Sequence, residues 1–255
     1  MVGVVRVGVF GAAGRMGGEV CRAVSADPEL ELVAAVDPMI KDPGVPSGTT
    51  PDVMADQGVE VAVDFTVAES AVQNARWCAA HGVHAVIGTS GIGEAALNEL
   101  RAAFTGPPNC LIAPNFAIGA VLMIRLAEMA APFFETAEII ELHHDAKVDA
   151  PSGTAVHTAE RLAAASSAWA PDPTRVYNVE GARGAVGAGQ IHIHSVRLRG
   201  LVAHQEVLLG TTGQSLSIRH DSYDRTSFIP GVLLAIKRIA DHPGVTIGLD
   251  ALLGL

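Results

Sequence analysis

The sequence predicts an α/β protein of two lobes: an amino-terminal lobe built on a parallel sheet, and a second lobe of the α+β class. Three observations support this prediction. The first half of the chain alternates short apolar runs with longer helix-like segments, as parallel strands joined by crossover helices do. After Pro114 this alternation stops, and three apolar runs later follow one another closely. A chain of 255 residues is long enough for one large α/β domain or two smaller ones.

The predicted strands of the first lobe are nearly continuous apolar runs, which indicates a sheet that is covered on both faces. They cover residues 4–10, 30–36, 60–65, 84–88 and 109–113. Helices are predicted between most of these strands, for example over residues 14–25 and 68–80. The apolar start of the chain is interpreted as a strand and not as a signal peptide, because Arg6 interrupts it and a glycine-rich turn follows.

The second lobe is predicted to begin with an apolar helix over residues 118–131 and a strand over residues 137–142. Its remaining strands are expected over residues 191–198, 206–211 and 215–220. Short glycine-containing connections join these last three runs, which is typical of antiparallel neighbours.

The carboxyl-terminal segment is assigned to the first lobe. An apolar helix predicted over residues 231–240 leads to the C-terminus and can pack back on that lobe. The predicted domains are therefore residues 1–117 with 227–255, and residues 118–226.

Composition excludes several classes of protein. The formal net charge of −10 argues against binding to nucleic acid or to an anionic membrane surface, because both need clustered Lys and Arg. Cys21, Cys78 and Cys110 are odd in number and widely spaced, so neither a disulfide framework nor a CxxC metal site is expected. No uncharged stretch reaches the ~20 residues that a membrane helix needs. These features predict a cytoplasmic protein with no nucleic-acid or membrane partner.

A glycine-rich turn follows the first predicted strand and runs directly into a helix. Gly8, Gly11, Gly14 and Gly17 recur at every third position, so the turn does not have the strict GxGxxG spacing. A strand, turn and helix in this order nevertheless present free N–H groups and the positive end of a helix to a phosphate. The alternative is that the glycines only make a tight turn. We interpret the turn as a dinucleotide site.

Asp37 supports the dinucleotide interpretation. It ends the second predicted strand about 20 residues beyond the glycines, where an acidic side chain usually receives the ribose hydroxyls. That position favours NADH, and no Arg directly follows it to receive a 2′-phosphate. Lys41 and Arg15 are close enough to take that role, so NADPH stays open as the alternative.

Two further strand ends are expected beside the glycine-rich turn, since ligands of α/β sheets bind at the carboxyl edge. They have the sequences Asp64-Phe65-Thr66 and Gly88-Thr89-Ser90-Gly91. Their small and hydroxyl-bearing residues leave space for the nicotinamide end of a cofactor.

The stretch 141–154, at the end of a strand in the second lobe, clusters two His and one Lys. If the backbone stays extended, His143 and Lys147 point to one side and His144 points to the other. Ser152-Gly153-Thr154 is predicted to open a helix whose free N–H groups form an anion site suited to a carboxylate.

These motifs resemble those of the 4-hydroxy-tetrahydrodipicolinate reductases, long called dihydrodipicolinate reductases. The resemblance spans almost the whole chain, and the H-H-x-x-K motif with P-S-G-T downstream is its most specific part. Two positions depart from the commoner family pattern: Ala146 stands where another His is frequent, and Ser90 replaces a second Thr.

The resemblance implies an amino-terminal Rossmann dinucleotide-binding lobe, and an α+β lobe with a mixed sheet that binds substrate and forms a homotetramer. It implies reduction of a small cyclic imine dicarboxylate by NADH or NADPH, with His143 and Lys147 as proton donors. It leaves open which of the two delivers the proton. His144, Gly153 and Thr154 match ligands of the substrate carboxylates. The residues that match cofactor ligands are Gly11, Ala12, Ala13, Gly14, Arg15, Met16, Asp37, Phe65, Thr66, Gly88, Thr89, Ser90, Ala113, Pro114, Asn115 and Phe116.

The sequence favours three other interpretations less. His192 and His194 share one strand face, but no third ligand falls at an obvious spacing, so no metal site is predicted. A different two-lobe dehydrogenase, acting on aspartate or an amino-acid semialdehyde, would share the cofactor lobe but lack the H-H-x-x-K and P-S-G-T motifs. A non-catalytic NAD(H)-sensing module would bind cofactor but have no dicarboxylate site.

Overall fold

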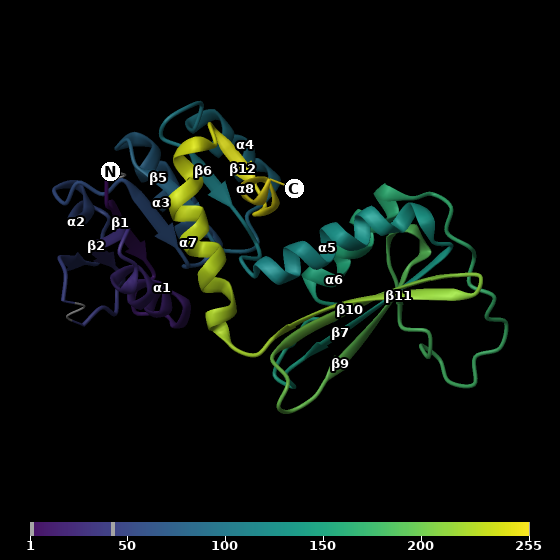
Figure 1. Cartoon of the computed structure of the whole chain (residues 1–255). Coiled ribbons are helices and arrows are strands. Elements are labelled where there is room, and N and C mark those ends of the chain that lie inside the picture. The colour runs from purple at the N-terminus through teal and green to yellow at the C-terminus, as the bar shows by residue number, and fades with distance from the viewer. Residues whose placement is uncertain (1–2, 42–43, 255) are drawn as a thin grey trace. The chain divides into compact units, whose positions relative to one another are not determined.

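The computed structural model describes residues 3–41 and 44–254, and the chain divides into two compact units (Figure 1). One unit comprises Met1–Ile118 with Arg225–Leu255, and the other comprises Gly119–Asp224. Each unit has its own sheet and its own hydrophobic core, which confirms the predicted fold class. No helix in the described residues is long and apolar enough to cross a membrane.

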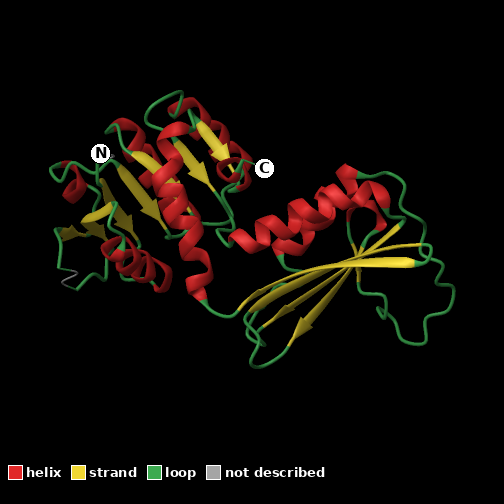
Figure 2. Ribbon diagram, viewed as in Figure 1, coloured by secondary structure: helices red, strands yellow, loops and turns green. Residues whose placement is uncertain are grey.

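The first unit is built on a seven-stranded parallel sheet with helices on both faces (Figure 2). The strand order is β12-β6-β5-β4-β1-β2-β3, in which the order reverses on either side of β1 as in doubly wound folds. The strands are β1 Val5–Phe10, β2 Leu30–Val36, β3 Ser47–Gly48, β4 Val61–Asp64, β5 His84–Ile87, β6 Cys110–Ile112 and β12 Val245–Ile247. The helices are α1 Arg15–Ala26, α2 Asp52–Ala55, α3 Ala68–Ala80, α4 Glu94–Ala103, α7 Ile229–Arg238 and α8 Asp250–Leu253.

Burial explains why the strands of this sheet are apolar along their whole length. All four residues of β4 and the last four residues of β1 are buried, because helices cover both faces. The carboxyl ends of β1, β4 and β5 therefore lie at one edge of a rigid platform.

The second unit holds a five-stranded mixed sheet in the order β11-β10-β7-β9-β8, and α5 and α6 lie on one of its faces (Figure 2). Its strands are β7 Thr136–His143, β8 Ala185–Val186, β9 His192–Arg197, β10 Ala203–Thr211 and β11 Gln214–Ser222. Its main helices are α5 Ile118–Ala130 and α6 Gly153–Ala165. Ile139 on β7 and Val207 on β10 are fully buried in the core against these helices.

The predicted position of β9 in the second sheet is wrong. The runs that form β9, β10 and β11 were expected to be antiparallel neighbours, and this is correct only for β10 and β11. Instead, β9 pairs in parallel with β7, which separates it from β10. Short connections reveal which strands follow each other along the chain, but long-range side-chain contacts decide which strands pair.

The end of the chain adds a strand that the sequence pattern did not predict. After α7, β12 pairs in parallel with β6 at the edge of the first sheet. The buried Asn109 amide holds this segment, donating to the carbonyls of Ile239 and Ala240 at 2.9 and 3.1 Å and accepting from the Gly244 N–H at 3.2 Å. A three-residue strand is too short to have a recognisable period, so only this tertiary clamp locates it.

The Asn109 clamp predicts a stability effect. We expect Asn109→Ala to lower the thermal unfolding midpoint by about 5 °C or more, because the Ala240 carbonyl and the Gly244 N–H lose the hydrogen bonds of the Asn109 amide and the Ile239 carbonyl keeps only the His242 N–H. Asn98→Ala is the matched control: Asn98 is exposed on α4 and bonds only to surface groups, so its loss should change the midpoint by less than about 2 °C. Equal midpoints for the two variants in differential scanning calorimetry would contradict the clamp.

Candidate active site

The glycine-rich turn after β1 is shaped by close backbone contacts. Gly11 has a positive φ of 73°, and Gly14 precedes the first turn of α1. A methyl group on Gly17 would lie 2.0 Å from the Gly11 carbonyl oxygen, so α1 can pack this closely on the turn only with glycine there. The N-cap residue of α1 is Gly14, which has no side chain to cap the helix. The N–H groups of residues 11–14 already donate hydrogen bonds within the chain, so a phosphate at this turn would meet the first N–H groups of α1 and its positive end.

Asp37 lies next to the turn, although 24 residues separate it from Ala13. Its carboxylate accepts the Ala13 N–H at 3.2 Å and the Met39 N–H at 2.7 Å, which ties the end of β2 to the turn. A carboxylate offers about four acceptor sites. The side chain is therefore fixed in place while acceptor capacity remains for ribose hydroxyls.

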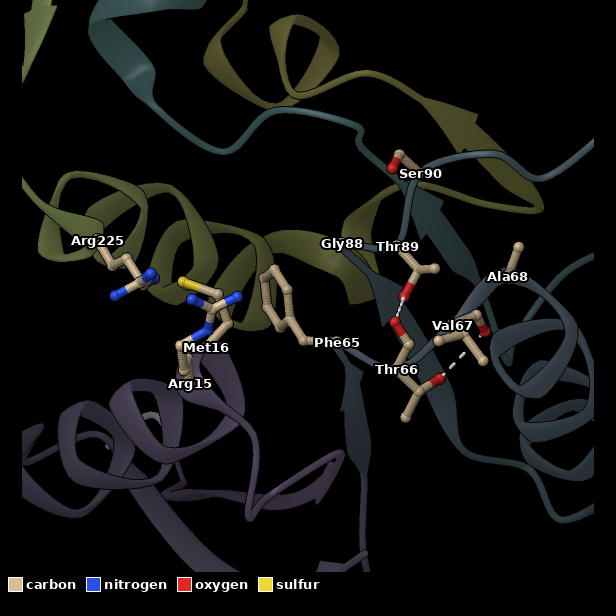
Figure 3. A pocket seen from close by; sticks show the side chains of 10 residues that line it. All are labelled: Arg15, Met16, Phe65, Thr66, Val67, Ala68, Gly88, Thr89, Ser90 and Arg225. Atoms are coloured by element: carbon tan, nitrogen blue, oxygen red, sulfur yellow. Dashed lines mark hydrogen bonds between the residues drawn. The ribbon is translucent and has the colours of Figure 1, made fainter. Parts of the chain in front are cut away.

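A cavity of about 530 Å³ opens at the carboxyl edge of the first sheet (Figure 3). Its volume lies in the range of small-molecule sites. Its lining residues are Arg15, Met16, Phe65, Thr66, Val67, Ala68, Gly88, Thr89, Ser90 and Arg225. The cavity brings together the start of α1 and the ends of β4 and β5, as the sequence predicted. It also includes Arg225, which was not among the predicted site residues because it lies far along the chain.

The Phe65 ring is fixed by its neighbours in this cavity. A methyl group on Gly88 would lie 2.1 Å from the ring, so the ring packs directly on the Gly88 backbone. The Phe116 ring lies on another side, with a centroid separation of 5.8 Å and a tilted geometry. The Ala113 N–H donates to the Ile87 carbonyl at 3.0 Å, which places the 113–116 segment beside the end of β5. None of residues 113–116 is among the residues that line the cavity, and Phe116 contacts it through Phe65.

A buried carboxylate supports the cavity wall. Asp64, at the end of β4, is 3% exposed. It accepts the Thr66 N–H and hydroxyl at 2.8 and 2.7 Å, the Asn74 amide at 2.7 Å and the Thr89 hydroxyl at 3.3 Å. Thr66 and Thr89 line the cavity, so Asp64 connects the two loops that follow β4 and β5.

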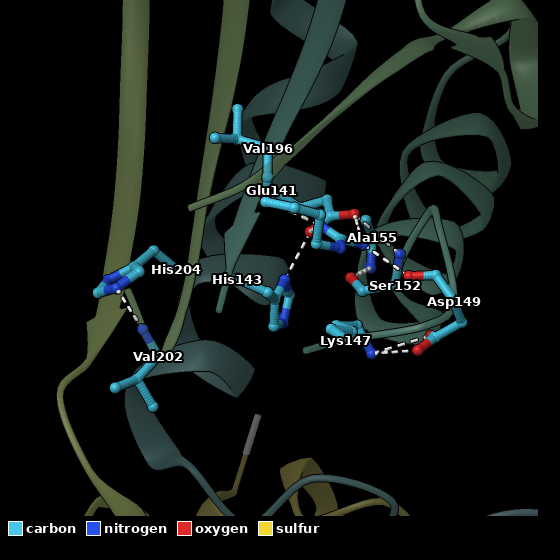
Figure 4. Close-up of polar contacts among 10 residues, drawn as sticks. Glu141, His143, Lys147, Asp149, Ser152, Ala155, Val196, Val202 and His204 are labelled. Carbon is cyan, nitrogen blue, oxygen red and sulfur yellow. Dashed lines mark hydrogen bonds and ion pairs between the residues drawn. The ribbon is translucent and has the colours of Figure 1, made fainter. Parts of the chain in front are cut away.

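In the second unit, the Glu141 carboxylate holds the stretch 141–154 in place (Figure 4). Glu141 was not among the predicted site residues. The Glu141 side chain on β7 is fully buried. It accepts two hydrogen bonds of 2.8 Å from Arg197, one of 2.5 Å from His143 Nδ1 and one of 3.2 Å from the Ser152 N–H. The only sequence signal was an acidic residue within an apolar strand.

Arg197 explains why β9 lies next to β7. Both terminal nitrogens of its guanidinium donate hydrogen bonds to Glu141, and one of them also donates to the Asp149 carbonyl at 2.6 Å. A bidentate guanidinium is the cation best suited to neutralise a buried carboxylate. Arg197 therefore fixes both the end of β7 and the loop that follows it.

Glu141 also sets the tautomer of the neutral His143 ring. A carboxylate can only accept, so Nδ1 of His143 carries the hydrogen and Nε2 carries a lone pair. Burial lowers the pKa of His143 below its ordinary value, and the positive charges of Lys147 and Arg197 lower it further. The hydrogen bond to Glu141 and its negative charge raise the pKa, but they do not outweigh burial. His143 is thus a neutral imidazole of fixed orientation near pH 7.

Lys147 reaches the site by a turn, and not along an extended backbone as predicted. The Lys147 N–H donates to the His144 carbonyl at 3.2 Å, which closes the turn after β7. Its ammonium group donates to both Asp149 oxygens at 2.7 and 2.9 Å. Figure 4 shows Lys147 and His143 next to each other, and their electrostatic interaction agrees with this. His144 is exposed.

Helix α6 begins at the predicted anion turn. Ser152 caps it, with Oγ accepting the Ala155 N–H at 3.2 Å. Gly153 and Thr154 form the first turn, and the buried Ser152 ties that turn to Glu141 through its N–H. The positive end of α6 therefore lies on the same hydrogen-bond network as His143.

His192 and His194 belong to a different network. His192 bonds to the Arg183 carbonyl and to Asp172, while His194 bonds to Glu138 at 2.6 Å. In the parts of the chain that the structure describes, no group of three or more His, Cys, Asp or Glu side chains could hold a metal ion.

Comparison with known proteins identifies the family. Residues 5–116 match the family described as "Dihydrodipicolinate reductase, N-terminus", and residues 119–253 match "Dihydrodipicolinate reductase, C-terminus". The chain belongs to the dihydrodipicolinate reductase family. A 4-hydroxy-tetrahydrodipicolinate reductase of Cutibacterium acnes is 50% identical over 98% of this chain and 99% of its own length.

Solved structures agree with this family. A dipicolinate-bound dihydrodipicolinate reductase from Paenisporosarcina sp. TG-14 has a TM-score of 0.86 and 38% identity, covering 97% of this chain and 99% of that one. GenD2 of gentamicin A biosynthesis, in complex with NAD, has a TM-score of 0.64 at 17% identity over 99% of this chain and 91% of that one. The second likeness shows only a shared fold. Members of the dihydrodipicolinate reductase family are oxidoreductases, and their Rossmann domain implies the use of NAD(P)H.

The environment of His143 predicts a pH effect on stability. Because its folded pKa lies below the ordinary value of 6.5, the unfolded chain binds more protons than the native chain when pH falls through this range. The contribution of neutral His143 to stability is present above pH 6.5 and is lost as pH falls towards its folded pKa. Wild type and His143→Gln should therefore differ less in free energy of unfolding at about pH 5.5 than at about pH 7.5. Urea unfolding of both proteins across this pH range measures the difference. A difference in free energy of unfolding that grows on acidification would contradict the prediction.

Proposed function

We propose that this chain catalyses the NAD(P)H-dependent reduction of 4-hydroxy-tetrahydrodipicolinate to tetrahydrodipicolinate, in the diaminopimelate route to lysine. The observation that carries the proposal is the network around buried Glu141. It holds an imidazole, an ammonium group and the positive end of a helix together at one end of β7. Such an arrangement suits a small dicarboxylate that must receive a proton.

The two units have different roles in this proposal. Residues 1–117 with 227–255 form the dinucleotide-binding domain, and residues 118–226 form the domain for substrate binding and tetramerisation. Structural boundaries fall after Ile118 and after Asp224.

The cofactor roles follow the geometry of the first unit. The turn from Gly11 to Met16 binds the pyrophosphate, because it presents the uncapped start of α1. Asp37 binds the adenosine ribose. The cavity residues Phe65, Thr66 and Gly88–Ser90 hold the nicotinamide end, and Phe116 with Ala113, Pro114 and Asn115 supports it from β6. The cofactor supplies a hydride, while the chain binds and orients it.

NADH is the preferred cofactor in this proposal. The Asp37 carboxylate, held by two backbone N–H groups, would repel a 2′-phosphate on the same ribose. Pro38 and Met39 follow it, so the position that commonly holds a phosphate-binding Arg is not basic.

The substrate roles are divided between charge and proton transfer. The N–H groups of Gly153 and Thr154 bind the substrate carboxylates, together with the exposed His144. In the reaction, one hydride and one proton enter the substrate and its hydroxyl leaves as water. Lys147 delivers the proton from its ammonium group, because neutral His143 presents a lone pair at Nε2. His143 orients the substrate, and Asp149 holds Lys147 in position.

The homotetramer is proposed to form through the sheet face of the second unit that α5 and α6 do not cover. Along β7, Ile139 and Glu141 are buried, so Ile140 and Leu142 point to the opposite face and are only partly buried. Leu208 on β10 adds another apolar side chain there. Apolar side chains on an open face are suited to burial between subunits.

A parallel assay tests the reaction and the cofactor preference together. Purified protein with freshly made 4-hydroxy-tetrahydrodipicolinate should oxidise both cofactors, with kcat/KM about tenfold higher for NADH than for NADPH. Absorbance loss is the measurement. No oxidation of either cofactor, with cofactor binding intact, would favour the sensing module or another dehydrogenase. Competition by pyridine-2,6-dicarboxylate is expected only of a protein with the dicarboxylate site.

Substitution of Lys147 tests the assignment of the acid. Lys147→Ala should lower kcat by at least about 100-fold and leave the dissociation constant for NADH nearly unchanged, because Lys147 belongs to the second unit. Arg199→Ala is the matched control, since it removes an exposed cation that pairs with Asp145, a residue in the same loop as Lys147. It should retain nearly full activity. Equal loss of cofactor binding in Lys147→Ala would contradict the assignment.

A further inference from the structure

The Asp64 carboxylate is a buried charge that has no role in the reaction as proposed above. Its four hydrogen bonds come from an N–H group, two hydroxyls and an amide, all of them neutral donors. Within the described residues, no Lys, Arg or His forms an ion pair with it. Burying an unpaired charge is costly, and its partners only solvate it without neutralising it.

The position of this charge is close to the cavity. The Thr89 hydroxyl, which lines the cavity, lies 3.3 Å from Asp64 Oδ1, and Thr66 both lines the cavity and donates two hydrogen bonds to the same oxygen. The carboxylate thus lies one hydroxyl group behind the wall (Figure 3 shows Thr66 and Thr89). With so little water around it, its field is weakly screened within the cavity.

We propose that Asp64 stabilises the positively charged, oxidised nicotinamide and so favours hydride donation from the reduced cofactor. This inference rests on the proposed function, which assigns the cavity to the nicotinamide end. When the hydride leaves with two electrons, the ring changes from neutral to positive. A fixed anion behind the wall stabilises the charge that develops in the transition state and needs no reorganisation at that moment. Asp64 acts through space from behind Thr66 and Thr89, so it is a positioning residue and not a catalytic one.

The matched variant is Asp64→Asn, which removes the charge but keeps the shape. The new amide oxygen can still accept the Thr66 N–H, and a flip of the Asn74 amide lets it accept from the new NH₂ group. We expect the ratio of dissociation constants, NAD⁺ over NADH, to rise about tenfold, mainly through weaker binding of NAD⁺. Isothermal titration calorimetry of the full chain measures both constants without turnover.

Two other variants complete the test. Glu31→Gln makes the same change of charge near the amino end of β2, away from the cavity, and should leave the ratio unchanged. If Asp64→Asn folds poorly, Asn74→Lys places a cation beside the same carboxylate and should also raise the ratio. An unchanged ratio in both Asp64→Asn and Asn74→Lys, with NAD⁺ and NADH still binding, would overturn the role of Asp64 alone. A wild-type chain that binds neither cofactor would overturn the proposed function as well.

Discussion

The buried carboxylate of Glu141 is the contact on which the second unit depends. Arg197 reaches it from β9, His143 from the end of β7 and the Ser152 N–H from the start of α6. Such a network need not add net stability, because desolvation of two charges offsets much of their attraction. Its effect is on geometry: removal of one partner leaves the other buried and unpaired, so alternative strand orders and loop positions are strongly disfavoured.

The first unit is governed by a steric constraint at the carboxyl edge of its sheet. The Gly17 and Gly88 backbones are in contact with the Gly11 carbonyl and the Phe65 ring, at separations where no other side chain fits. These contacts bring the uncapped end of α1 and the loops after β4 and β5 to one cavity. Both units thus use a fixed backbone to present polar groups, and among the described residues of the first unit no cation pairs with the buried carboxylate of Asp64.

Much of this arrangement could be predicted, because each signal was local. Strand β2 was predicted at its observed ends, and so was α3, since period and flanking turn residues lie within a few positions of one another. The helix start at Ser152 was predictable for the same reason. The place of β9 and the strand β12 were not, because each is set by contacts with residues far along the chain.

The sequence by itself determined the two-lobe α/β class, the glycine-rich turn before α1, the helix start at Ser152 and the family, since all of these are expressed in short, contiguous patterns. Only the tertiary structure decided the orientation, burial and protonation of the chemical groups. The orientation of His143 depends on Glu141, whereas its neutrality depends on burial and, to a lesser extent, on the nearby positive charges of Lys147 and Arg197. The Glu141 carboxylate can be buried because Arg197, 56 residues away, lies against it. Burial and pairing are properties of groups that meet in space, and no period along the chain encodes which residues will meet.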